Sequence, residues 1–198
     1  MSDLMSWQKW YNIFLESAKE GEEKGTAVSP VHKTDHLLRV WENAKILCEK
    51  LHGDLEIMVA AVMLHDLGRH YGIEIHGEKS AELAKPILEK SGFPGEKIPS
   101  ALEAIAQHDY TFPKEKRKRL EARILYDADK MDAFGVIGVY RHVIFVEKGR
   151  MKLEEVVPAL NKRFDGFALP ESKKLAKGDY EYIVNFFKVL EKELGGEK

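Results

Sequence analysis

The sequence predicts an all-α fold, a compact bundle of several helices. Between its Gly and Pro breaks, apolar residues recur at steps of three and four, the spacing of one face of an α-helix. The one strand-like segment, Val143–Val146, has no apparent partner strand. At 198 residues the chain is long enough for one domain with a substantial core. We therefore expect a single helical domain over residues 1–198.

The first helix is expected at about Asp3–Glu20. Its aromatic residues Trp7, Trp10 and Phe14 follow helical spacing, and a stripe of this kind is typical of core packing. Gly and Pro then interrupt the pattern, which predicts a loop from Gly21 to Lys33.

The next two helices are expected to carry histidines on their apolar faces. One begins at Thr34 or Asp35 and starts its apolar face with His36. Asp54 can cap the other, in which His65 joins the apolar stripe.

Inward polar residues recur in the next three segments. A helix from His76 to Ser91 contains Pro86, which can kink it. The helix after it places His108 on its apolar side, and a long helix at Lys114–Phe134 places Asp129 inward. Three further helices are expected, at Val136–Glu147, Lys152–Arg163 and Asp179–Leu194.

Composition excludes several classes of protein. With 44% apolar and 32% charged residues, no window is apolar enough to span a membrane. The N-terminus lacks a secretory signal, so we expect a cytoplasmic location. The formal charge of −2 argues against a generally basic nucleic-acid binder, and the basic run from Lys114 to Arg123 is expected to be a solvated helix face. The single Cys48 is expected to be a buried core residue.

His65 and Asp66 stand together at the end of an apolar run, where burying either without a partner is costly. Pairing between them or with backbone groups is one solution. A divalent metal is another, because imidazole and carboxylate both bind first-row ions. Any one such histidine is usually a hydrogen-bonded core residue. The pair belongs to a larger set of inward polar residues. One partner shared by the whole set explains their burial better than a separate partner for each. The other members are His36, His76, His108 and Asp129.

These residues resemble the HD-domain superfamily of metal-dependent phosphohydrolases, whose pattern is a His, then His-Asp, then a distant Asp. The resemblance covers roughly residues 34–142. It lies in HLLRVWENA (His36), MLHDLGR (His65 and Asp66), HGEKSAELA (His76), IAQHD (His108) and ILYDADKMDAFGVIGVYR (Asp129). The last stretch is most similar to small stand-alone bacterial and archaeal members.

The resemblance implies a ligand set and a chemistry. Four residues would coordinate one divalent ion: His36, His65, Asp66 and Asp129. His76 and His108 match positions that hold a second ion in some members and contact substrate phosphate in others. The expected ion is Mn²⁺, Mg²⁺, Co²⁺, Ni²⁺ or Fe²⁺. A metal-activated water needs no protein nucleophile, and Asp66 is the expected catalytic residue, which orients or deprotonates that water.

The resemblance also implies a substrate class. Nucleotidases of the superfamily carry an acidic residue about one turn after the His-Asp pair, where this chain has Arg69 and His70. The DADKMDAFGVIGVYR stretch is instead similar to members that cleave nucleoside triphosphates to monophosphate and pyrophosphate. Cations near such a site would neutralise phosphate oxygens, and the candidates are Arg69, Lys79, Lys130 and Arg141.

The expected function is hydrolysis of a nucleotide or related phosphate ester or anhydride. The expected partner is thus a small phosphorylated substrate, with no membrane and no nucleic acid. One alternative is a non-catalytic nucleotide-binding or regulatory domain of the same superfamily. Another is a di-iron oxygenase with a similar helical core, since His and carboxylate ligands also suit iron.

Overall fold

The computed structural model describes residues 6–25, 34–73 and 75–195, to which all structural statements below refer. These residues form helices and no strands, which confirms the predicted all-α fold. The α-helices are α1 (Ser6–Lys24), α2 (Thr34–Leu51), α3 (Leu55–Leu64), α4 (Gly77–Ser91), α5 (Ile98–Ala106), α6 (Leu120–Met131), α7 (Gly135–Glu147), α8 (Leu153–Asp165) and α9 (Pro170–Leu194). Two short 3₁₀-helices are η2 (Leu67–Tyr71) and η3 (Lys114–Lys116).

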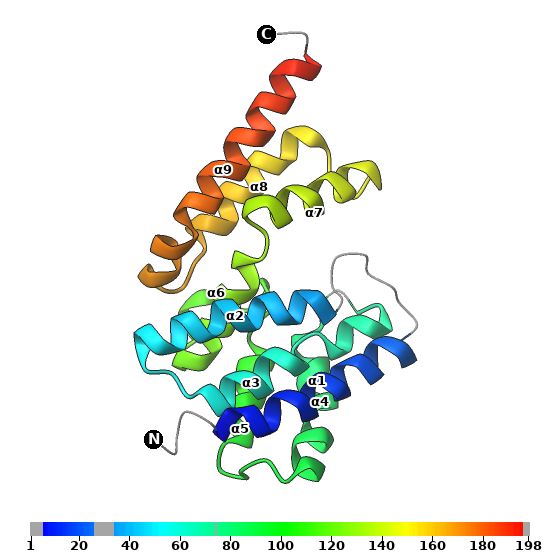
Figure 1. Cartoon of the computed structure of the whole chain (residues 1–198). Coiled ribbons are helices and arrows are strands. Elements are labelled where there is room, and N and C mark those ends of the chain that lie inside the picture. The colour runs from blue at the N-terminus through cyan, green and yellow to red at the C-terminus, as the bar shows by residue number, and fades with distance from the viewer. Residues whose placement is uncertain (1–5, 26–33, 74, 196–198) are drawn as a thin grey trace. The chain divides into compact units, whose positions relative to one another are not determined.

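The helices group into two compact units, Met1–Ala128 and Asp129–Lys198, and each is described by itself. Helices α1 to α5 lie in the first unit and α7 to α9 in the second, while the chain passes between the units within α6 (Figure 1). That the whole chain acts as a single domain stays a prediction.

Helix α3 is the centre of the first unit. Asp54 caps it as predicted, accepting hydrogen bonds from the backbone N–H groups of Glu56 (2.9 Å) and Ile57 (3.1 Å). Every residue from Ile57 to Leu64 is buried, because α1, α2 and α5 all pack against this helix. In Figure 1, α3 lies between α2 and α1. A helix that is apolar on all sides belongs in the interior, and its end carries His65 into the core.

Helix α1 packs its aromatic stripe inward, as predicted. Trp10 and Phe14 are buried and both contact the ring of Phe93 edge-on. The helix continues through Gly21 to Lys24, so the expected loop cannot begin at Gly21. The rest of that loop, residues 26–33, lies outside the described residues.

Helix α4 contains Pro86 and ends at Ser91, as expected. One further boundary differs from the sequence expectations. The segment expected to be one long helix from Lys114 instead contains the short turn η3, and α6 begins only at Leu120. In this segment the expected solvated face is also wrong for one residue, since Arg117 is buried.

The second unit is built from α7, α8 and α9. Helix α9 begins at Pro170, earlier than expected, because Pro is favoured in the first turn of a helix. The strand-like segment Val143–Val146 is part of α7. Helices α7 and α8 both pack against α9 around a core that includes Phe134, Leu160 and Ile183.

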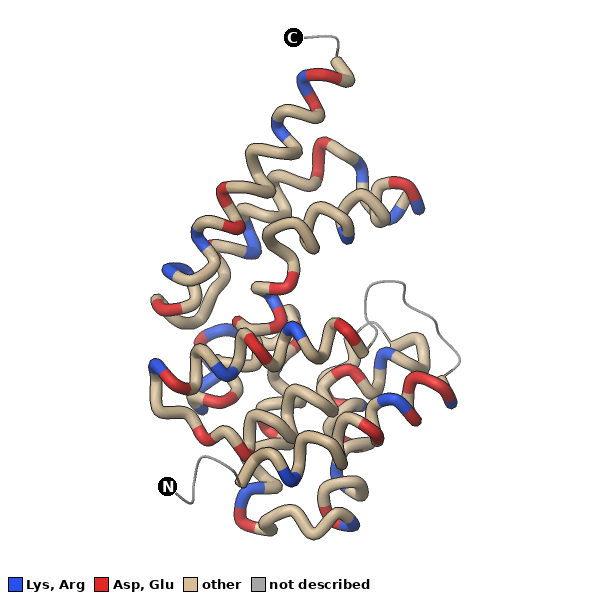
Figure 2. The backbone as a smooth tube through the Cα atoms, viewed as in Figure 1, with Lys and Arg blue, Asp and Glu red and all other residues tan. Residues whose placement is uncertain are grey.

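Charged residues of both signs lie along the helices. Figure 2 shows acidic and basic residues interspersed over the helices of both units. Among the described helices, none is both long and apolar enough to span a bilayer.

Cys48 is buried on α2, and burial raises the pKa of its thiol to about 12. The thiol therefore stays protonated at neutral pH and serves as a core residue.

Candidate metal centre

His36 enters the site from the first turn of α2. Its side chain is completely buried, as its place at the start of the apolar face predicts. Its Nε2 atom lies 3.8 Å from Oδ2 of Asp66.

His65 and Asp66 lie just beyond α3, where the chain turns toward η2. His65 is expected on this helix from the sequence, but α3 ends one residue earlier at Leu64 and His65 is its C-cap. The Nδ1 atom of His65 lies 2.7 Å from the carbonyl oxygen of Val62. A carbonyl only accepts, so Nδ1 carries the proton and Nε2 keeps its lone pair. This Nε2 lies 3.6 Å from Oδ1 of Asp66, and both side chains are buried.

His76 and His108 approach the same carboxylate from another side. His76 is the N-cap of α4, and its Nε2 lies 2.7 Å from Oδ1 of Asp66 and 3.0 Å from Nε2 of His108. His108 follows α5 rather than lying within it, and its Nδ1 donates to the carbonyl of Ile105 at 2.6 Å. Its Nε2 thus also presents a lone pair.

These side chains make two buried triads that share Asp66. One is His36, His65 and Asp66, the other Asp66, His76 and His108, and in each the candidate ligand atoms lie within 4.8 Å of one another. Imidazole nitrogen with carboxylate oxygen is a donor set suited to Mn, Fe, Co, Ni or Zn. Metal-binding histidines commonly donate Nδ1–H to a backbone carbonyl and bind the metal through Nε2. The residues present therefore fit a divalent ion.

Two basic candidates belong to the first unit, and only one of them touches this cluster. Arg69 donates from Nε to Oδ1 of Asp66 at 3.1 Å. Lys79 pairs instead with the exposed Glu82 at 2.8 Å. His70 is buried on η2, and burial lowers the pKa of its imidazole, which favours the neutral form near pH 7.

Asp129, Lys130 and Arg141 belong to the second unit. Asp129 is only half-buried, whereas Asp127, two residues earlier on α6, is completely buried. Arg141 is buried and its Nη1 lies 2.5 Å from Oδ2 of Asp132. The placing of Asp129 as a metal ligand and of the two cations as phosphate contacts stays a prediction.

Sequence reasoning missed two residues that support the cluster, Asp109 and Arg117. Asp109 is buried directly after His108, and its carboxylate accepts the backbone N–H of Gly77. Arg117 is buried and donates to backbone carbonyls of the segment that carries Asp109. A signal for Asp109 was available, because HD at 108–109 repeats the dipeptide at 65–66. None was available for Arg117, which stands in a basic run.

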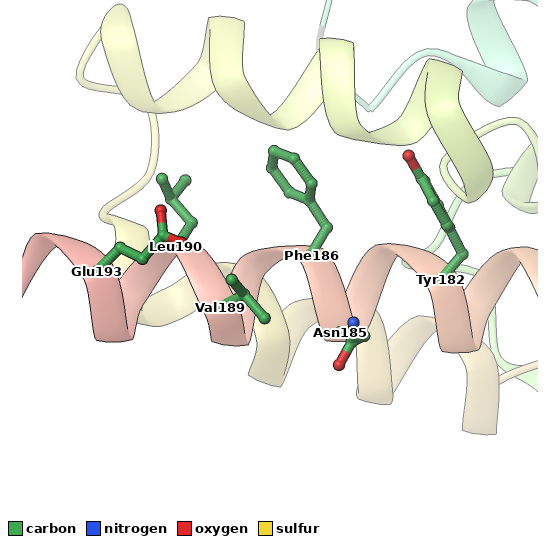
Figure 3. Close-up of a pocket in the computed structure, with 6 residues that line it drawn as sticks. All are labelled: Tyr182, Asn185, Phe186, Val189, Leu190 and Glu193. Atoms are coloured by element: carbon green, nitrogen blue, oxygen red, sulfur yellow. The ribbon is translucent and has the colours of Figure 1, made fainter. Parts of the chain in front are cut away.

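A surface groove in the second unit is separate from these residues. It is lined along one side of α9 by Tyr182, Asn185, Phe186, Val189, Leu190 and Glu193 (Figure 3). None of the sequence-predicted site residues lines it. Its largely apolar lining has no metal-binding cluster, so it does not compete with the buried centre as a reaction site.

Comparison with known proteins gives one family and a set of related folds. The sequence profile of the HD domain matches residues 34–133, half of the chain. No curated protein matches the chain.

The solved structures that resemble this chain cover nearly its whole length. A predicted HD superfamily hydrolase from an uncultured Thermotogales bacterium is 25% identical, with a TM-score of 0.65 over 94% of this chain and 92% of that one. An HD-superfamily hydrolase from Bacillus thuringiensis is 22% identical, with a TM-score of 0.76 over 97% and 100%. Bacillus subtilis YpgQ in complex with ADP is 20% identical, with a TM-score of 0.72 over 94% and 98%.

Proposed function

Because the chain belongs to the HD-domain family, we propose that it is a metal-dependent phosphohydrolase. Its substrate would be a nucleotide or a related phosphate ester or anhydride. The observation that carries the proposal is the pair of buried triads around Asp66, built from His36 and His65 on one side and His76 and His108 on the other. A divalent ion bound there supplies an acidified water and polarises a phosphoryl oxygen.

We assign the first ion to His36, His65 and Asp66, with Asp129 as a fourth ligand. The Nδ1–H of His65 is held by the Val62 carbonyl, so its Nε2 is available for coordination. His76 and His108 hold either a second ion or a substrate phosphate. Either role uses their Nε2 atoms, which both face the centre of the cluster.

Asp66 is the proposed catalytic residue. Its two carboxylate oxygens face different histidines, with Oδ2 toward His36 and Oδ1 toward His76. A carboxylate so placed can bind an ion with one oxygen and accept a hydrogen bond from the attacking water with the other. The guanidinium of Arg69 lies 3.1 Å from Oδ1 and pairs with the carboxylate.

We infer that the substrate phosphates are neutralised by Arg69, Lys79, Lys130 and Arg141. Arg69 has the most direct support, because it lies beside Asp66 and its side chain is 30% exposed. A guanidinium in this position offers a planar set of donors that matches phosphate oxygens.

A nucleotide is the proposed substrate for two reasons. YpgQ, which shares the fold, is seen in complex with ADP. The DADKMDAFGVIGVYR stretch is similar to members that cleave nucleoside triphosphates to monophosphate and pyrophosphate. We therefore place triphosphates first among the nucleotides to be tested.

One experiment tests the ion and the reaction together. Purified protein is submitted to elemental analysis and then incubated with a panel of nucleotides in Mn²⁺, Mg²⁺, Co²⁺ or Ni²⁺. We expect a bound divalent metal and release of phosphate or pyrophosphate from at least one nucleotide. Asp66→Ala should abolish turnover with an unchanged circular dichroism spectrum. Asp165→Ala, an exposed acid at the end of α8, should keep full turnover.

The same measurements separate the alternatives. Absence of turnover with every ion, together with a nucleotide-dependent rise in melting temperature, would favour a binding or regulatory domain. Bound iron with an oxo-bridge absorption band would favour the di-iron oxygenase.

A further inference from the structure

The carboxylate of Asp109 connects two parts of the first unit. Its Oδ2 accepts the backbone N–H of Gly77, the first residue of α4, and its Oδ1 lies 3.4 Å from Nδ1 of His76. The first N–H groups of a helix have no partner within the helix, so a negatively charged acceptor is favoured there. One side chain thus contacts both the start of α4 and the ring of its N-cap residue.

This approach depends on a glycine at the start of α4. A Cβ on Gly77 would lie 2.6 Å from the carbonyl oxygen of Ala106 and 2.8 Å from Oδ2 of Asp109. Real Cβ atoms do not come so close, and the first of these neighbours is backbone. The absence of a side chain at Gly77 therefore sets how closely the segment with Asp109 packs against α4.

Arg117 holds the backbone on which Asp109 stands. Its guanidinium donates to the carbonyl oxygens of Gln107 (2.8 Å), Asp109 (3.3 Å) and Phe112 (3.2 Å). The guanidinium also lies over the ring of Tyr126, 3.7 Å from its centroid, a favourable cation–π contact. With only 2% of its surface exposed, Arg117 is an internal brace that closes the loop after α5.

We propose that Asp109, braced by Arg117, is a positioning residue that acts through His76. An Nδ1–H directed at the Asp109 carboxylate fixes the ring so that Nε2 points to Asp66 and His108. Without an ion, Nε2 of His76 donates to Oδ1 of Asp66 at 2.7 Å. A proton held on Nδ1 by Asp109 would leave the Nε2 lone pair of the neutral ring to a bound ion. A carboxylate behind a ligating histidine also raises its basicity and fixes its orientation. The inference rests on the proposed function, because it concerns the same metal centre.

The first test measures metal affinity and turnover in two variants of Asp109. Asp109→Ala removes the acceptor for the Gly77 N–H and the carboxylate beside Nδ1 of His76, and we expect a roughly 10- to 100-fold rise in the dissociation constant for Mn²⁺. Asp109→Asn keeps one amide oxygen as acceptor, so it should recover part of this loss. The matched control is Glu115→Ala, an exposed acid six residues later in the same segment, which should bind Mn²⁺ like the wild type.

The second test follows the His76 ring directly, without turnover. The ¹⁵N signals of the histidine ring nitrogens report which nitrogen carries the proton, and they can be recorded with and without Mg²⁺. We expect the His76 signals to shift in Asp109→Ala while those of His65, held by the Val62 carbonyl, stay in place. A merely structural role for Asp109 would alter both histidines or neither.

The brace is tested by Arg117→Met, which removes the three hydrogen bonds and keeps an apolar side chain. If Arg117 acts through Asp109, its effect on Mn²⁺ affinity should not add to that of Asp109→Ala in the double variant. Arg117→Lys provides a second, milder variant should the methionine variant fail to fold.

Two results would overturn the inference, and neither depends on hydrolysis. One is wild-type Mn²⁺ affinity in Asp109→Ala. The other is a set of His76 ring signals identical to those of the wild type. If the wild type binds Mn²⁺ but hydrolyses no nucleotide, the proposed function is wrong. The Mn²⁺ affinity of Asp109→Ala still decides the role of Asp109 in that case.

Discussion

His65 donates its Nδ1–H to the carbonyl of Val62 at 2.7 Å, and His108 makes the same contact with the carbonyl of Ile105 at 2.6 Å. In both cases the acceptor lies three residues earlier, in the last turn of the preceding helix. Two helix ends thereby orient the two imidazoles, and both rings direct Nε2 toward the centre of the cluster.

The first prediction concerns the His-Asp pair. A His65→Ala, Asp66→Ala double variant should lose stoichiometric metal, because Asp66 belongs to both triads. An ion that binds only the folded state at about 100 times its dissociation constant stabilises it by about 2.7 kcal/mol. Addition of Mn²⁺ should therefore raise the melting temperature of the wild type, reversibly with a chelator, and leave that of the variant unchanged. Stoichiometric metal in the variant would show that the centre is wrongly assigned.

Arg69 gives a prediction about substrate. A charge-assisted hydrogen bond contributes about 1.5–3 kcal/mol, so Arg69→Ala should raise KM for the hydrolysed nucleotide by about ten- to a hundredfold. Arg69→Lys should recover only part, since lysine keeps the charge and loses the planar donors. Lys85→Ala, which alters an exposed lysine on α4, is the control. An unchanged KM in Arg69→Ala would remove this residue from the phosphate site.

The third prediction is a pH dependence of stability in the second unit. His142 is buried, and burial lowers the pKa of its imidazole from 6.5 to about 4. Between these values the unfolded chain takes up a proton that the folded chain does not, so the stabilisation is complete above pH 6.5 and lost as the pH falls toward 4. The difference corresponds to roughly 3 kcal/mol at most.

Urea unfolding at pH 7.5 and pH 5 measures this effect. His142→Gln keeps a donor for the carbonyl of Gly138, which His142 contacts at 2.8 Å, and should lose less stability on acidification than the wild type. His52→Asn alters an exposed histidine whose positive φ asparagine tolerates, and it should behave like the wild type. Equal acid sensitivity in all three proteins would exclude His142 as the cause.

The fourth prediction compares two glycines of the second unit. A Cβ on Gly138 in α7 would lie 2.2 Å from the carbonyl oxygen of Ala133 and 2.8 Å from Cδ1 of Ile183. The helix propensity of alanine favours the substitution by about 1 kcal/mol, but overpacking costs about 1–3 kcal/mol, and a backbone neighbour cannot easily move. We expect Gly138→Ala to lower the free energy of unfolding.

Gly178 in α9 is the matched comparison. A Cβ there meets nothing within 4 Å, so only the helix propensity acts and Gly178→Ala should stabilise the protein by up to about 1 kcal/mol. Thermal and urea unfolding of the two variants should thus give changes of opposite sign. Stabilisation by both substitutions would mean that α7 and α9 pack less tightly than described.

Much of the fold is predictable from the sequence because local signals decide it. Asp54 begins α3, and Gly92 ends α4 in the left-handed conformation that glycine adopts readily. The beginning of α6 is not predictable in this way. The periodicity before Leu120 is helical, but Arg117 turns inward to reach carbonyls of the preceding loop, a tertiary contact that overrides the local pattern.

The first-unit part of the site was predictable for a different reason. A buried His or Asp must be satisfied, so His36, His65 and His108 on apolar faces predict a common centre from the sequence alone. The support of His76 was not predictable, because its contact with Asp109 joins residues 33 positions apart through a close approach at Gly77. The role of Asp129 rests on resemblance alone.

The burial of α3 on every side has a consequence for hydrogen exchange. From Ile57 to Leu64 this helix is enclosed by α1, α2 and α5, so the amide protons of this stretch should exchange only when the whole first unit unfolds. His65 and Asp66 follow directly from that helix. Local opening elsewhere in the first unit should therefore leave this pair in place. The metal centre should persist for as long as α3 stays folded.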